Sequence, residues 1–177
     1  MNNHLIELEK VAMDRLEEYG NSVGVFVASS GGKDSVVVHH LARKVFGDKV
    51  PVIHTPKVTG FNKVHPATIT FLYEESAKYG LNIVPFAQMQ EFLDTRALYI
   101  QIDGSRRSEF DRSDRSADVM INGVLINRAD MPVHTTGGLF GNESIFPIVD
   151  WSDDDVWEYI NEERIAHTEE YRILATR

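Results

Sequence analysis

The chain has 177 residues, of which 42% are hydrophobic and 25% charged, a composition that suits one globular domain with a sizeable core. Its 18 Lys and Arg face 27 Asp and Glu, and the net charge of -9 makes nucleic acid an unlikely partner because such binding needs a basic surface. Cysteine is absent, so the chain itself provides no disulfide, no cysteine-ligated iron–sulfur cluster and no thiolate nucleophile. It also lacks an apolar run of membrane-spanning length and a signal-peptide pattern at its N-terminus, so we expect a cytoplasmic protein with no membrane partner.

The first half of the chain alternates between helical and extended patterns. In chain order we predict a helix over 3–19, a strand over 22–28, a helix over 34–46, a strand over 50–54, a helix over 65–79 and strands over 81–86 and 97–102. Strands that recur with helices between them are typical of βαβ units, and continuous apolar runs suit parallel strands covered on both faces. The pattern therefore predicts an α/β fold with a doubly wound, mainly parallel, Rossmann-like sheet, whose ligand binds beyond the C-terminal ends of the strands.

The second half of the chain is less regular. We predict an Arg-rich polar segment over 103–117, a hairpin over 119–126, a long loop over 127–143, a short strand over 144–149 and a helix over 153–163. The hairpin rests on Asn122-Gly123, a pair that favours a type I′ turn. We expect a single domain over residues 1–177, with an irregular region at about 103–143.

The segment Ser-Ser-Gly-Gly-Lys-Asp-Ser at residues 29–35 joins a predicted strand to a predicted helix. Glycines let backbone N–H groups approach phosphate oxygens, and a helix N-terminus adds free N–H groups and a favourable dipole. Lys33 adds a positive charge, whereas Asp34 either orients the loop or meets a metal ion. The glycine spacings of the Walker loop and of the dinucleotide fingerprint are absent, and the alternative to a phosphate site is an ordinary Ser-Gly turn that caps a helix.

Three motifs resemble one known family. Residues 30–35 match the Ser-Gly-Gly-x-Asp-Ser signature of the PP-loop ATP pyrophosphatases, also called adenine nucleotide α-hydrolases. Residues 146–151 and 155–160 resemble a second signature, found in the branch with the phosphoadenylyl-sulfate (PAPS) reductases and the small subunit of ATP sulfurylase. Residues 104–109 resemble the Gly-x-Arg-x-x-Glu segment of that branch. The resemblance runs from about residue 22 to 160 and implies binding of ATP or a related adenine nucleotide, with Mg²⁺.

The chain also departs from this family. Its reductases attack sulfur with a C-terminal cysteine, and many bind an iron–sulfur cluster, but this chain has no cysteine. The family usually shows Asp-Thr-Gly and Pro-Glu-Thr after the second strand, where this chain has Val58-Thr59-Gly60 and Pro66-Ala67-Thr68. The resemblance therefore implies attack on the α-phosphate of ATP by an oxygen or nitrogen acceptor. The alternative is a non-catalytic module, or a subunit of a larger assembly, that binds a nucleotide or PAPS.

Two charged segments have open interpretations. Arg106 and Arg107 are predicted to hold a nucleotide phosphate or an acidic co-substrate, because planar guanidinium groups bind such anions bidentately. Arg112 and Arg115 are more simply explained by ion pairs with neighbouring acids on a solvated helix. Around residues 150–155 we predict a capping box from Ser152 to Asp155, with Asp153 and Asp154 as first-turn acids, and keep Asp150 as a candidate functional residue.

The predicted site follows from these motifs. The nucleotide-binding residues are predicted to be Ser29, Ser30, Gly31, Gly32, Lys33, Asp34, Ser35, His54 and Gly60. The catalytic residues are predicted to be Lys33, Asp34, Arg106 and Arg107, and Asp34 is also the predicted metal ligand. The expected partners are a small-molecule nucleotide and an unidentified acidic or nucleophilic co-substrate, with room for a protein partner or a homo-oligomer.

Overall fold

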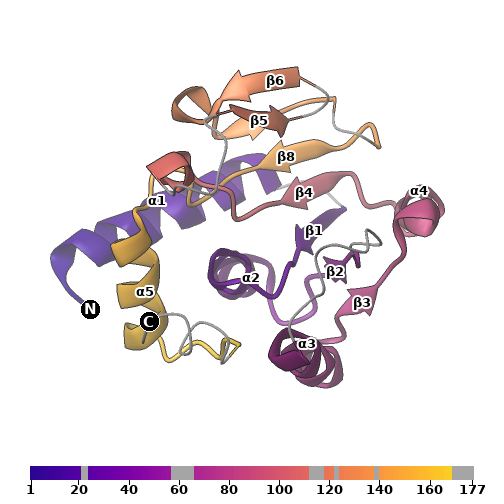
Figure 1. Cartoon of the computed structure of the whole chain (residues 1–177), viewed down its shortest axis with the longest axis horizontal. Coiled ribbons are helices and arrows are strands. Elements are labelled where there is room, and N and C mark those ends of the chain that lie inside the picture. Colours follow the sequence, from indigo (N-terminus) through magenta and orange to yellow (C-terminus); the bar gives the residue numbers. More distant parts are fainter. Residues whose placement is uncertain (21–23, 57–65, 112–117, 122–123, 138–139, 169–177) are drawn as a thin grey trace.

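The computed structural model describes residues 1–20, 24–56, 66–111, 118–121, 124–137 and 140–168 (Figure 1). Its strands are β1 (Val25–Ala28), β2 (Val52–His54), β3 (Asn82–Ile83), β4 (Ile100–Ile102), β5 (Asp118–Ile121), β6 (Val124–Asn127), β7 (His134–Thr135) and β8 (Glu143–Ile145). Its helices are α1 (Asn3–Gly20), α2 (Lys33–Phe46), α3 (Pro66–Tyr79), α4 (Met89–Thr95) and α5 (Asp153–Glu162). Short 3-10 turns are η1 (Phe86–Gln88), η2 (Arg107–Asp111) and η3 (Arg128–Asp130). None of the described helices combines the length and apolar character needed to cross a membrane.

The central sheet confirms the predicted α/β architecture. Within the described residues its strand order is β3-β2-β1-β4-β8-β7, and β5 and β6 form a separate antiparallel pair. All neighbouring strands of the central sheet are parallel except β7, which pairs antiparallel with β8 at one edge. After β1 the chain builds β2 and β3 on one side, and it then crosses to place β4 on the other side of β1. The strand order therefore reverses between β1 and β4, which is where doubly wound sheets bind ligands.

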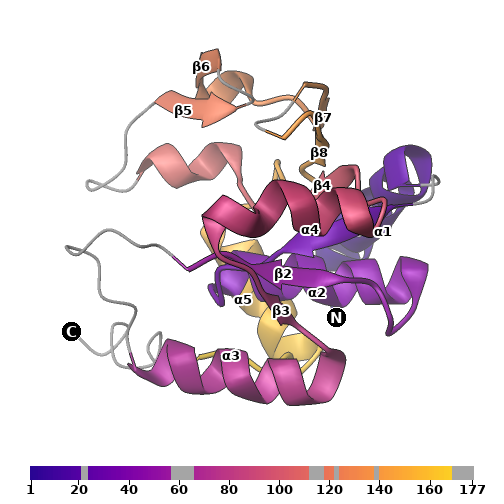
Figure 2. The same ribbon diagram turned by 90° about the vertical axis from the view of Figure 1, so that its right-hand side faces the viewer.

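Helices cover both faces of this sheet (Figure 2). One core cluster joins Val27 of β1 to buried residues of α1, α2, α3 and α5, among them Leu16, Leu41 and Val156. The neighbouring residue Phe26 points to the opposite face and packs in a second cluster with Leu93 of α4. Because successive strand residues alternate between faces, a continuous apolar run in β1 fills both cores at once.

The structure differs from the predicted elements at the ends of two strands. The strand predicted over 81–86 is only Asn82–Ile83, because Pro85 has no N–H for a ladder and leads into η1. The strand predicted to start at residue 97 starts at Ile100, since Ala97 adopts a left-handed backbone with φ 52°. Helix α4 was not predicted at all. The hairpin is confirmed by the pairing of Ile121 with Val124, while its predicted turn residues lie outside the described part of the chain.

A charged cluster ties α2 to α1 and to the end of α5. The Lys44 ammonium donates hydrogen bonds to Glu9 and to Glu163, and Nε2 of His40 lies 3.2 Å from Oε2 of the same Glu163. Burial lowers the pKa of His40 below its ordinary value. The hydrogen bond from Lys44 lowers the pKa of Glu163. Both shifts favour the neutral histidine and the ionised glutamate in the folded state.

These pKa shifts predict that the protein loses stability on acidification. As pH falls below the ordinary histidine pKa of 6.5, the unfolded state binds a proton that folded His40 resists. Below the ordinary glutamate pKa of 4.5 the contribution of Glu163 is lost as well, as pH falls through its depressed folded pKa. The thermal unfolding midpoint, measured against pH, should therefore decline in two stages. His40→Gln should flatten the upper stage only, and a variant curve parallel to that of the parent would contradict this account.

Candidate functional site

The loops that follow β1 and β4 meet at the reversal of strand order. Ser29–Gly32 follow β1 and lead into α2, and residues 103–106 follow β4. A Cβ added to Gly104 would lie 2.8 Å from the backbone carbon of Asp34 and 3.1 Å from the nitrogen of Ser35. The backbone after β4 therefore contacts the first turn of α2 directly, at a distance that only glycine allows.

The predicted phosphate loop is shaped by its own hydroxyls. Gly31 donates its N–H to Oγ of Ser29 at 3.3 Å, and Gly32 donates to Oγ of Ser30 at 3.2 Å. Gly31 has φ +77°, a backbone conformation that favours glycine. A Cβ added at this position would lie only 3.0 Å from a methyl of Thr68 on α3. These short-range bonds bend the chain sharply between β1 and α2.

The first turn of α2 presents backbone N–H groups without helical partners. Gly32 is its N-cap and supplies no side-chain cap, and Oγ of Ser35 turns back to donate to the Gly32 carbonyl at 2.8 Å. The first helical hydrogen bond runs from Val36 N to Gly32 O and is 3.1 Å long. The N–H groups of the three helical residues before Val36 therefore have no acceptor within the helix. Together with the positive end of the helix dipole, this turn is suited to bind an anion.

His54 lies at the C-terminal end of β2 but contacts the loop rather than open space. Its Nδ1 is 2.8 Å from the carbonyl oxygen of Ser29, and the residue is buried. If the ring donates from Nδ1, it fixes the entry to the loop. Its predicted contact with a nucleotide remains a prediction, and the predicted site residue Gly60 lies outside the described residues.

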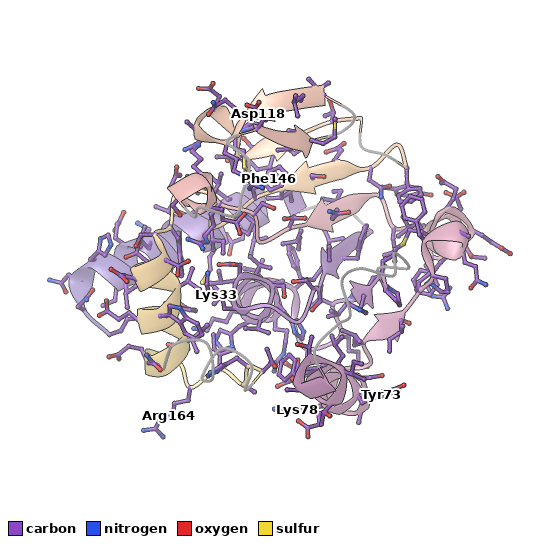
Figure 3. All side chains as sticks on the ribbon, in the orientation of Figure 1. Lys33, Tyr73, Lys78, Asp118, Phe146 and Arg164 are labelled. Carbon is purple, nitrogen blue, oxygen red and sulfur yellow. The ribbon has the colours of Figure 1, made fainter. Side chains whose placement is uncertain are left out.

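Four charged side chains join the loop to α5, where α2 and α5 approach each other (Figure 3). Nζ of Lys33 lies 2.9 Å from Oδ1 of Asp34 and 2.8 Å from Oδ1 of Asp153. The guanidinium of Arg106 spans the same two acids, with Nε 2.8 Å from Asp34 Oδ1 and Nη2 2.7 Å from Asp153 Oδ1. Two cations and two carboxylates thus form one neutral network.

Arg106 is the most enclosed member of this network, with 0% of its surface exposed. Besides its two acidic partners, Nη1 donates to Oγ of Ser108 at 2.8 Å and to the carbonyl of Trp151 at 3.1 Å. All three nitrogens of the guanidinium therefore donate to protein groups. In this structure Arg106 holds Asp34 and Asp153 in place, and its predicted contact with a ligand phosphate would require some of these bonds to be exchanged.

Arg107 faces away from this network. Its Nε donates to the carbonyl of Met131 at 2.8 Å, and its Nη1 pairs with the carboxylate of Asp150. Asp150 also pairs with Arg15 of α1 through its other oxygen, at 2.5 Å. Arg106 and Arg107, which were predicted to act together, therefore contact different partners. Arg107 and Asp150 form an ion pair next to η3.

The neighbouring charged residues also have partners. Glu109 is buried and accepts a hydrogen bond from Nη1 of Arg128 at 2.9 Å, which joins residues 19 positions apart. Arg112 and Arg115 lie outside the described residues.

The predicted capping box is confirmed, since Ser152 and Asp155 exchange hydrogen bonds at the start of α5. Asp153 lies in the first turn of α5 as predicted, and its carboxylate also pairs with Lys33 and Arg106, which the sequence did not indicate.

A magnesium ion held by the protein does not fit these residues. Both oxygens of Asp34 accept hydrogen bonds from Lys33, and one of them also accepts from Arg106. The part of the chain that the structure describes contains no group of three metal-ligating His, Asp or Glu side chains. Mg²⁺ often reaches a protein on substrate phosphates and keeps several waters.

The fold and the loop make the chain similar to α/β proteins of the PP-loop, adenine nucleotide α-hydrolase type. Residues 24–103 match the model of the phosphoadenosine phosphosulfate reductase domain family, and this range includes the phosphate loop. The resemblance indicated by the motifs is thereby confirmed.

Known proteins extend the comparison. An uncharacterised protein of Methanocaldococcus jannaschii is 26% identical over 199 aligned residues, which cover 93% of this chain and 44% of that protein. The PAPS reductase of Candida auris, solved as a phosphate complex, superposes with a TM-score of 0.63 at 15% identity over 98% of this chain and 92% of its own. FMN adenylyltransferase of Candida glabrata has a TM-score of 0.67 at 15% identity over 96% of this chain and 59% of its own. At such identities the two solved structures establish the fold alone.

Proposed function

We propose that this chain binds ATP, or a closely related adenine nucleotide, with its phosphates at the first turn of α2. The observation that carries the proposal is the N-terminus of α2, which has no side-chain cap and opens at the reversal point between β1 and β4. An uncapped helix start at this point of a doubly wound sheet is a favourable place for phosphate. The match of residues 24–103 to a family named for a nucleotide substrate supports the same ligand class.

The reaction that best suits this site is attack on the α-phosphate, with pyrophosphate as the leaving group. The backbone N–H groups of Lys33, Asp34 and Ser35 would hold the leaving phosphates, and catalysis would come from positioning and from charge stabilisation. A chain without cysteine cannot supply a thiol as the acceptor. The acceptor then lies on a separate co-substrate, and we propose an oxygen or nitrogen nucleophile such as a carboxylate, sulfate or amine.

A specific observation favours the second candidate, a nucleotide- or PAPS-binding module without turnover. The two cations nearest the loop, Lys33 and Arg106, are already neutralised by Asp34 and Asp153. Transition-state stabilisation needs positive groups that face the reacting phosphate. If these pairs persist when the nucleotide is bound, the site could hold a nucleotide without activating it.

Incubation with ATP labelled at the α-phosphate separates these functions. The purified chain, with Mg²⁺ and a panel of oxygen and nitrogen acceptors, should release pyrophosphate and transfer the label to one acceptor or to water as AMP. Calorimetric titrations with ATP and with PAPS should accompany the assay. Binding without label transfer would favour the module. Failure to bind either nucleotide would contradict the proposed function as a whole.

A further inference from the structure

The two cations of the network are more deeply buried than its two carboxylates. The side chains of Lys33 and Arg106 are only 2% and 1% exposed, whereas those of Asp34 and Asp153 are 18% and 45% exposed. The cations therefore lie beneath, and the carboxylates lie nearer to solvent. An anionic ligand that approaches the start of α2 meets negative charge before it meets positive charge, and such like-charge contact is unfavourable.

One carboxylate oxygen contacts two buried cations at once, as a phosphate oxygen could. Oδ1 of Asp153 lies 2.8 Å from Nζ of Lys33 in an ion pair, and it accepts a hydrogen bond from Nη2 of Arg106 at 2.7 Å. These are the distances of charge-assisted hydrogen bonds, and lysine and arginine make the same bonds to phosphate. The pair of cations is thus preorganised around two anionic oxygens of the protein itself, Oδ1 of Asp153 and Oδ1 of Asp34.

Asp153 is also the acid that can leave with least disturbance. Asp34 lies on the first turn of α2, where its backbone is held against Gly104. Asp153 is nearly half exposed, and the start of α5 is capped separately by Ser152 and Asp155. A rotation of the Asp153 side chain towards solvent would remove one carboxylate from both cations, which keep Asp34 as their other partner, while the capping box keeps α5 formed.

We propose that Asp153 is a displaceable internal counter-ion, which occupies the Lys33–Arg106 cation pair in the nucleotide-free protein and is replaced there by a nucleotide phosphate. This inference rests on the proposed nucleotide site, and it adds that Asp153 regulates nucleotide binding there. Exchange of the carboxylate for phosphate links ligand binding to the position of α5. Before exchange, the negative charge of Asp153 selects against free polyphosphate and in favour of its magnesium complex.

The test compares Asp153→Asn with Asp154→Asn, the exposed neighbour in the same helical turn. Without nucleotide, Asp153→Asn should lower the thermal unfolding midpoint, because two buried cations lose a partner. It should nevertheless bind ATP in excess EDTA about tenfold or more tightly than the parent, the change produced by about 1.4 kcal/mol. The corresponding increase in affinity for magnesium-bound ATP should be smaller. Asp154→Asn should match the parent in all of these affinities.

The outcomes separate the two claims. If the parent binds magnesium-bound ATP but Asp153→Asn binds free ATP equally or less tightly, the counter-ion is not displaced and this inference is overturned, while the nucleotide site stands. If neither protein binds ATP in either form, the proposed function is wrong and the inference falls with it. If Asp153→Asn does not fold, Asp153→Ser serves the same comparison because serine is favourable near a helix start. Asp153→Glu, which restores the charge, should return the affinity for free ATP towards that of the parent.

Discussion

Arg106→Ala should lower the free energy of unfolding by about 3–5 kcal/mol, the cost of removing one partner from a buried ion pair. The arginine is fully buried, and its loss leaves Asp34 and Asp153 with Lys33 as their shared cation. It also removes the donors to Ser108 and to the carbonyl of Trp151. Urea unfolding at neutral pH, followed by circular dichroism, measures the change.

Arg107→Ala is the matched control for this prediction. Its side chain is 34% exposed, and its ion pair with Asp150 is reached by solvent. Such exposed pairs contribute at most about 1 kcal/mol, and the hydrogen bonds that Arg107 donates to the carbonyl of Met131 add about 1 kcal/mol. Arg106→Lys should recover only part of the stability, because one ammonium cannot reproduce the planar fork that spans Asp34 and Asp153. Equal losses for Arg106→Ala and Arg107→Ala would show that the network does not hold the loop to α5.

Gly104→Ala should disrupt the contact between the loops that follow β1 and β4. The added methyl would lie 2.8 Å from the backbone carbon of Asp34 and 2.9 Å from its carbonyl oxygen. Neither atom can move without displacing the first turn of α2. We expect overpacking to cost about 1–3 kcal/mol of stability. We also expect ATP affinity to fall, because the displaced turn carries the N–H groups that would hold the phosphates; calorimetry and thermal unfolding measure both effects.

Gly47→Ala is the control at the other end of α2. Gly47 has φ +85°, but a methyl there would meet nothing within 4 Å. Its backbone conformation alone should cost about 1–3 kcal/mol, so the two variants are similarly destabilised. Only Gly104→Ala should weaken ATP binding. Equal weakening in both would mean that affinity follows overall stability and that the loop contact has no special role.

The phosphate loop could be predicted because its signals are local. A strand, a turn rich in serine and glycine, and a helix follow one another within residues 25–46, and each has its own pattern. The hydrogen bonds that shape the turn join residues only two or three positions apart, such as Gly31 to Ser29. The parallel sheet could likewise be predicted, since its apolar strands repeat with helices between them.

The charged network could not be predicted in the same way. Arg106 reaches Asp34 across 72 positions of the chain and Asp153 across 47. In the sequence Asp153 is one of several acids at a helix start, and that setting alone explains its residue type. Only the fold, which brings the start of α5 beside the start of α2, distinguishes Asp153 from Asp154. Long-range pairing of this kind leaves no periodic or local signal.

The first turn of α2 is the part of the chain that we propose to bind the phosphates of an adenine nucleotide. The most direct measurement is an NMR titration of ¹⁵N-labelled protein with magnesium-bound ATP, which follows the backbone amides. We expect the largest shifts at Lys33, Asp34 and Ser35, whose N–H groups precede the helical ladder. The amide of Asp154 on α5 should shift less. Saturable shifts confined to other parts of the chain, with these three amides unchanged, would contradict the account.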